Sequence, residues 1–239
     1  MKKEILKNTN SIYEDFIKAA INSNIKVLGF SDHAFFENVI NHKNKSKQKE
    51  LDEYISLIVS LREKYKKIIK IKLGFEIEYQ ENFYSYYRYL LEEKKFDFLI
   101  LGQHMTYNSN NDDLVNIISY KNSLIKGIET GLFLYICHPD FFMKNVKKIT
   151  PEIEKICSEI CEISIKYDVP FEVDFDSLNE DSYFWKIVSK KSVKCVLGLD
   201  VDDPQKITNS LIEKSFKIAK EKNINLVKTI TTINTNLKY

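Results

Sequence analysis

Apolar runs of strand length recur along the chain, and most are continuous rather than alternating with polar residues. A run that is apolar at successive positions predicts a strand covered on both faces, as in parallel sheets. The runs predict seven strands, at Ile25–Phe30, Ile71–Ile77, Phe96–Leu101, Leu132–Cys137, Pro170–Val173, Val193–Leu199 and Asn225–Ile230.

Segments with helical periodicity separate these runs. They predict helices over Ser11–Ser23, Lys47–Lys67, Glu81–Lys95, Asp113–Thr130, Pro151–Tyr167, Asp181–Lys190 and Pro204–Lys222. The pattern Ser11-x-x-Glu14 is typical of a capping box at a helix start. Pro151 and Pro204 stand where a first helical turn tolerates proline, and Gly131 suits the position after a helix end.

Sustained alternation of strands and helices predicts a parallel sheet. At 239 residues, closure into one barrel domain spanning residues 1–239 is the natural solution, and an open doubly wound sheet is the alternative. The phosphate-loop patterns GxGxxG and GxxxxGK[ST] are both missing from the sequence. In a barrel, the active site would lie at the carboxyl ends of the strands.

Charge and hydropathy narrow the choice of partners. The chain carries 36 basic and 34 acidic residues, a formal net charge of +2, which favours neither nucleic acid nor membrane as partner. No apolar stretch approaches the ~18 residues of a membrane span, and the opening residues lack the apolar core of a signal peptide. We expect a cytoplasmic protein whose four cysteines are reduced and buried.

Residue types that bind metal ions gather where the predicted strands stop. His33, His104 and His138, three of the four histidines, each follow such a run. Carboxylates occupy similar positions at Glu76, Glu78, Glu172, Asp174, Asp200, Asp202 and Asp203. Because the strand ends of a parallel barrel face one side, these groups are expected to converge, and mixed imidazole and carboxylate ligands suit Zn, Mn or Fe.

Some polar and aromatic residues have simpler interpretations. Glu78 is interpreted as a charge on the rim of the site, and His42 as a solvated side chain in a lysine-rich loop. The aromatic run Phe83–Tyr89 has helical spacing, which favours a packing surface over a platform for stacking bases.

Five short motifs occur in the order and spacing of a known family. They are GFSDH (Gly29–His33), GFEIE (Gly74–Glu78), GQHM (Gly102–Met105), CHPD (Cys137–Asp140) and GLDVDDP (Gly198–Pro204). Together they resemble the PHP phosphoesterases, and within them the histidinol-phosphate phosphatase type, over roughly residues 8–220.

The resemblance implies a distorted (β/α)7 TIM-like barrel of the PHP type that holds up to three metal ions. By motif position it implies metal ligation by His33, Glu76, His104, His138 and Asp200, with Glu76 bridging two ions. Glu76, His138 and Asp200 are the residues expected to carry catalysis. The reaction implied is hydrolysis of a small phosphate ester by a metal-activated water.

The chain departs from the family pattern at two places. The family opens with a strand that ends in an HxH motif, but no histidine precedes His33 and only Lys3–Leu6 could form a stub of that strand. The family's final D-x-H appears here as Asp200-Val201-Asp202, and Asp202 as a metal ligand would suit a harder ion such as Mn²⁺ or Mg²⁺. The implied ligand set is complete only at Glu76, His104 and His138.

A barrel that lacks its first strand has two unpaired edges. Met1–Leu6 filling the gap, a partner subunit of a homo-oligomer filling it, or a start lost from the chain would each account for this, and the sequence leaves the three open.

Three functions follow from this pattern. The first is a metal-dependent phosphomonoesterase that acts on a small phosphorylated metabolite, as in histidine biosynthesis. The second is a degenerate member of the family that serves as a metal-binding or regulatory module, as the missing HxH suggests. The third, a phosphodiesterase or exonuclease, is disfavoured because no basic stripe is present.

Overall fold

The computed structural model describes residues 2–34, 45–104 and 112–227, and places six strands in two parallel three-stranded sheets. The strands are β1 (Val27–His33), β2 (Lys70–Ile77), β3 (Phe98–Leu101), β4 (Phe171–Val173), β5 (Lys194–Leu197) and β6 (Asn225–Leu226). One sheet has the order β1-β2-β3 and the other β4-β5-β6. The predicted parallel α/β architecture is therefore confirmed.

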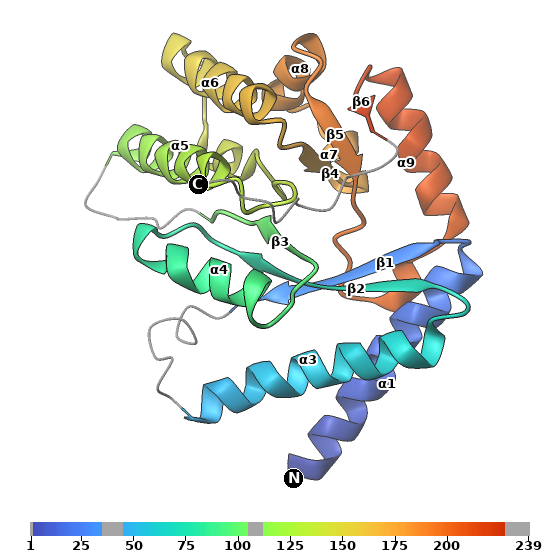
Figure 1. Ribbon diagram of the computed structural model, residues 1–239. Coiled ribbons are helices and arrows are strands. Elements are labelled where there is room, and N and C mark those ends of the chain that lie inside the picture. The colour runs from blue at the N-terminus through green and yellow to red at the C-terminus, as the bar shows by residue number, and fades with distance from the viewer. Residues whose placement is uncertain (1, 35–44, 105–111, 228–239) are drawn as a thin grey trace.

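Helices precede and separate the strands (Figure 1). The α-helices are α1 (Lys2–Asn22), α3 (Lys45–Tyr65), α4 (Tyr84–Glu92), α5 (Asp113–Glu129), α6 (Pro151–Tyr167), α7 (Phe175–Asn179), α8 (Tyr183–Lys190) and α9 (Asn209–Glu221). Short 3-10 turns are η1 (Glu81–Phe83), η2 (Phe141–Asn145) and η3 (Pro204–Lys206). In Figure 1, α5 and α6 lie side by side, while α1 and α3 lie beneath β1 and β2.

The two sheets are joined through the segment around Ile136. Ile136 forms one parallel bridge to Leu101 of β3 and another to Phe171 of β4. The predicted strand over Leu132–Cys137 is therefore reduced to a single bridged position. Gly131, just before this segment, and His138, just after it, both have positive φ, which limits the extended backbone between them to a few residues. The hydrogen-bonded order still follows the chain from β1 to β6.

Closure of this order into a barrel is not established. Among the described residues, β6 pairs only with β5, and β1 only with β2. Between these two ends, α1 contacts η3, and the Ser23 hydroxyl donates a hydrogen bond to the Ile207 carbonyl at 3.0 Å. The suggested stub at Lys3–Leu6 is not a strand, because those residues lie within α1.

Most helix predictions hold, and their ends follow from caps. Helix α6 has the predicted bounds, with Thr150 capping its start and Pro151 in its first turn. The predicted capping box at Ser11 was wrong, because α1 begins nine residues earlier, at Lys2. The predicted helix over Pro204–Lys222 is split, because the Thr208 side chain accepts a hydrogen bond from the Leu211 amide and starts a new helix.

Other segments were only partly predicted. The helix predicted from Lys47 begins two residues earlier, at Lys45, and His42 lies outside the described residues. The predicted helix Glu81–Lys95 ends earlier, at Glu92, and Lys95 takes a positive φ. The short helix α7 was not predicted; Asp174 caps it by accepting from the Ser177 amide at 2.6 Å.

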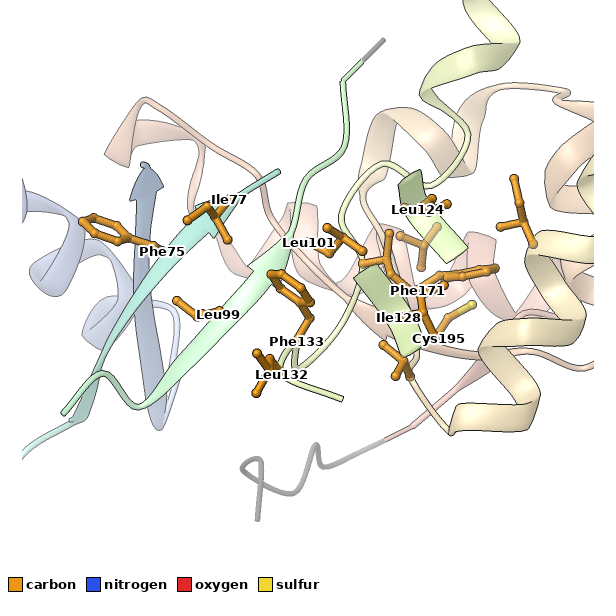
Figure 2. Packing of buried hydrophobic residues seen from close by; sticks show 14 of the residues in the cluster. Phe75, Ile77, Leu99, Leu101, Leu124, Ile128, Leu132, Phe133, Phe171 and Cys195 are labelled. Carbon is orange, nitrogen blue, oxygen red and sulfur yellow. The ribbon is translucent and has the colours of Figure 1, made fainter. Parts of the chain in front are cut away.

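Apolar side chains fill both faces of the strands. Figure 2 shows Leu99 and Leu101 of β3 packed with Phe133 and Leu132 in the main core. The alternate β3 residues, Phe98 and Ile100, form a small separate cluster with Cys137 on the opposite face. All four cysteines are free and buried, as predicted. None of the helices among the described residues has the length and apolar character that a membrane crossing requires.

Phe171 lies on β4 at the junction of the two sheets, and its side chain is completely buried, whereas Phe216 on α9 is 52% exposed. We expect Phe171→Ala to lower the free energy of unfolding by about 3–5 kcal/mol, because it leaves a cavity in the main core. The matched change Phe216→Ala should alter it by less than about 0.5 kcal/mol. Urea unfolding followed by circular dichroism measures both, and equal midpoints for the two variants would contradict this packing.

Candidate metal centre

Three residues from consecutive strand ends meet at one point. Glu76 lies near the end of β2, His104 follows β3, and His138 follows the bridged position Ile136. One potential ligand atom from each lies within 4.8 Å of those of the other two. The sequence predicted that these three would converge, and the structure brings them together.

Glu76 is the buried centre of this cluster. Its side chain lies directly over the backbone of Gly102, where an added Cβ would stand 2.0 Å from Glu76 Oε1. Only glycine leaves room for the carboxylate at this position. Beneath it, on the same face, the apolar cluster of Phe98, Ile100 and Cys137 keeps water away. Glu76 is only 6% exposed, so its charge must be balanced by groups within the protein or by a bound ion.

The separations around Glu76 fit a shared metal ion. Oε1 lies 3.1 Å from His138 Nε2 and 3.6 Å from His33 Nδ1. Even so, this buried oxygen has no partner with hydrogen-bond geometry among the described residues. Two ligands on a tetrahedral Zn²⁺, each about 2.0–2.1 Å from the ion, stand about 3.3 Å apart. The oxygen and the imidazole nitrogen are thus spaced as two ligands facing one ion.

His104 contacts a second carboxylate. Its Nδ1 lies 3.0 Å from Glu78 Oε1, and the ring of Phe141 packs edge-on against it, with centroids 5.0 Å apart. The hydrogen bond to Glu78 raises the pKa of His104, although partial burial opposes the shift. The interpretation of Glu78 as a mere rim charge was therefore wrong. The signal was available in the sequence, because Glu78 stands two residues after Glu76 and thus on the same side of the strand.

His138 lies in a turn with a strained backbone. Its φ is 33°, in the left-handed region that residues other than glycine seldom adopt. Tyr120 donates its hydroxyl to the carbonyl of Pro139 at 3.2 Å, and Trp185 Nε1 donates to Asp140 Oδ2 at 2.9 Å. Burial raises the pKa of Asp140 to about 6, although the Trp185 hydrogen bond opposes this. These contacts hold the turn on both sides.

Electrostatics favour an ionised Glu76. Burial alone would raise the pKa of Glu76, but His138 and His33 outweigh it and hold the pKa below its ordinary value. The pKa of Glu172 on β4 shifts in the opposite direction. Burial raises it well above its ordinary value, and neighbouring carboxylates, of which Asp200 has the largest effect, raise it further. Glu172 lies over Gly198 much as Glu76 lies over Gly102. The two carboxylates thus occupy equivalent positions but differ in charge balance.

The other predicted ligands are less well placed. His33 faces Glu76, but its side chain is 65% exposed. Asp200 lies near the cluster; partial burial raises its pKa, and His138 opposes the shift. Asp202 is 93% exposed and pairs with Lys206 at 3.3 Å, so the structure does not bring it to the cluster. Its predicted role as a ligand in place of histidine has no support in this geometry, because the i,i+4 ion pair directs it to solvent.

Parallel strands alternating with helices, together with an imidazole–carboxylate cluster at the strand ends, are typical of α/β proteins that bind metal ions. The sequence profile of the PHP domain family matches residues 6–175. The chain therefore belongs to the PHP domain family.

Solved structures share this fold. Histidinol phosphate phosphatase from Lactococcus lactis, crystallised with Zn, L-histidinol and phosphate, aligns with a TM-score of 0.64 and 16% identity, covering 91% of this chain and 90% of that one. A Listeria monocytogenes protein assigned as a histidinol phosphatase aligns with a TM-score of 0.60 and 14% identity, covering 82% and 90%. At these identities the likeness concerns the fold. No curated protein sequence matches the chain significantly.

The contact between Gly102 and Glu76 can be tested with a pair of glycine variants. Gly102→Ala should push the Glu76 carboxylate aside and weaken Zn²⁺ binding at least about tenfold, since even disturbing the partners of metal ligands has that effect. Gly131→Ala is the control: it has open space around its Cβ but a φ of +67°, so it should cost about 1 kcal/mol of stability and leave Zn²⁺ affinity unchanged. Calorimetric titration with Zn²⁺ measures the affinity. Equal affinities in the two variants would refute the assigned role of Gly102.

Proposed function

We propose that this protein is a metal-dependent phosphomonoesterase of the histidinol-phosphatase type that hydrolyses a small phosphate ester. The observation that carries the proposal is the convergence of Glu76, His104 and His138, with a buried Glu76 oxygen that lacks a hydrogen-bond partner among the described residues. Membership of the PHP domain family and the fold shared with histidinol phosphatases support it.

In this proposal Glu76, His104 and His138 hold a divalent ion, with Zn, Mn and Fe as the candidates. When bound, such an ion polarises phosphoryl oxygens and makes a nearby water more acidic. Glu76, kept ionised by His138 and His33, supplies the negative charge that retains the ion. The apolar floor of Phe98 and Ile100 lowers the local dielectric and so strengthens these interactions.

Residues around the cluster have separate roles. A pocket beside Glu76 is lined by His33, Glu78 and His104, and it gives a phosphate ester access to the cluster. His33 stands exposed on its edge, where its imidazole can donate to a phosphate oxygen. Asp200, with a pKa raised by partial burial, is the carboxyl proposed to hold a proton for the leaving alkoxide.

A second candidate function is a metal-binding or regulatory module without turnover. It is favoured by the outward position of Asp202 and by the exposure of His33, which leave one complete three-ligand cluster among the described residues. Such a module would bind one ion firmly yet lack a second ion to stabilise the leaving oxygen.

Hydrolysis of histidinol phosphate and of p-nitrophenyl phosphate, with Zn²⁺, Mn²⁺ or Fe²⁺ added, separates the two functions. We expect metal-dependent release of phosphate that falls at least about 100-fold in His138→Ala, matching the several kcal/mol that a metal ion contributes. Asp181→Ala is the control, because Asp181 is 84% exposed and pairs with Lys186 at 2.9 Å.

If the unmodified protein binds the ion but shows no turnover above that of His138→Ala, the enzyme proposal fails and the binding module stands. Turnover of p-nitrophenyl phosphate alone would retain the phosphomonoesterase and exclude histidinol phosphate as its substrate.

A further inference from the structure

Glu78 and His104 form a carboxylate–imidazole pair on adjacent strand ends. The distance from His104 Nδ1 to Glu78 Oε1 is 3.0 Å, and both side chains are partly buried. When it is ionised, the Glu78 carboxylate can only accept hydrogen bonds, and Nδ1 is then the donor. In the neutral imidazole this leaves Nε2 unprotonated, as a metal ligand must be.

The backbone that carries Glu78 is itself fixed by a buried tyrosine. The Tyr87 hydroxyl donates to the Glu78 carbonyl at 2.9 Å and accepts from the Gln80 amide at 2.8 Å. Tyr87 is fully buried on α4. Since Tyr87 has little freedom to move, the turn that follows β2 holds Glu78 in one place.

The segment that carries His104 is tied to the same turn. The buried Gln103 side chain accepts a hydrogen bond from the Tyr79 amide at 3.0 Å, and the Gly102 amide donates to the Ile77 carbonyl at 3.2 Å. The two strand ends are thus joined by one backbone–backbone hydrogen bond and one hydrogen bond to the Gln103 side chain. The Glu78–His104 pair can therefore form without ordering a loop first.

We propose that Glu78 is a positioning residue, which fixes the ring orientation and the tautomer of His104 so that Nε2 faces Glu76 and His138. This inference rests on the proposed metal site, since it assigns Glu78 the task of preparing one ligand of that site. Histidine ligands generally donate their second ring nitrogen to a carboxylate, a carbonyl or a water, and loss of that partner weakens metal binding 10–100-fold. Phe141, edge-on to His104, limits the alternative ring positions.

Two substitutions of Glu78 and one control test the proposal. Glu78→Ala removes the acceptor, whereas Glu78→Gln keeps one acceptor oxygen, removes the charge and replaces the other oxygen with a donor NH2 group. Glu81→Gln is the control, because Glu81 is 76% exposed and pairs with Lys126 at 3.0 Å, away from the imidazoles. Circular dichroism establishes that each variant is folded before it is used.

The first measurement is made on the full chain without metal. Nitrogen-15 NMR of the imidazoles reports which ring nitrogen carries the proton, and with four histidines the His104→Ala spectrum assigns the signal. We expect the Nδ1–H tautomer in the unmodified protein, in Glu78→Gln and in Glu81→Gln. In Glu78→Ala we expect a mixture of tautomers, because the acceptor is gone.

The second measurement is the affinity for Zn²⁺ alone, determined by competition with a chelator. We expect Glu78→Ala to bind about 10–100-fold more weakly, Glu78→Gln to recover most of that loss, and Glu81→Gln to match the unmodified protein. A purely structural role for Glu78 would not produce recovery by glutamine together with a change of tautomer.

The outcomes separate this inference from the proposed function. If Glu78→Ala keeps both the Nδ1–H tautomer and the full Zn²⁺ affinity, the positioning role is refuted and the proposed metal site stands. If the tautomer changes as expected but the unmodified protein binds no Zn²⁺, the proposed function fails, and with it the assigned purpose of the pair. Loss of affinity with an unchanged tautomer would also overturn the proposal, because the effect would then be one of charge.

Discussion

The burial of a negative charge at Glu76 is the constraint on which the rest of the site depends. The side chain is 6% exposed, and an isolated buried carboxylate is strongly unfavourable unless cations or hydrogen bonds balance it. The nearest balancing groups are imidazoles, His138 at 3.1 Å and His33 at 3.6 Å. A divalent ion would supply the further positive charge that a buried carboxylate needs. The same feature that makes Glu76 costly to bury makes it a strong ligand.

Two close approaches of backbone and side chain make this burial possible. Gly102 leaves space for the Glu76 carboxylate, and Gly74, two residues before Glu76 on β2, leaves space for the Phe98 ring, which would otherwise lie 2.3 Å from a Cβ. On one face of the adjacent strands β2 and β3, therefore, the Phe98 ring lies over Gly74 of β2, and the Glu76 carboxylate lies over Gly102, which follows β3. Replacing Gly74 would displace the ring, and replacing Gly102 would displace the carboxylate.

Local pattern in the sequence predicted the parallel strands and the convergence of metal-binding residue types at their ends, and the resemblance to the PHP family singled out Glu76, His104 and His138. Continuous apolar runs indicate buried parallel strands, and the side chains that follow them must converge at one end of the sheet. What it did not predict depends on tertiary contacts. The break between η3 and α9 has a local cap at Thr208, and the adjacent Ile207 carbonyl accepts a hydrogen bond from Ser23, just beyond the end of α1. The single bridged position at Ile136 reflects turns on both sides of it. The role of Glu78 required knowing which imidazole nitrogen it meets.

The charged groups around Glu76 on β2 and Glu172 on β4 explain why the pKa values of these two carboxyl groups shift in opposite directions. On the β2 side, the imidazoles lower the pKa of Glu76. On the β4 side, burial and nearby carboxylates raise the pKa of Glu172, and Lys206 holds Asp202 in solvent instead of near it. Burial and carboxylate neighbours thus favour the protonated form of Glu172, whereas imidazole neighbours favour the ionised form of Glu76. The difference between the two carboxyl groups follows from where the chain places its few imidazoles.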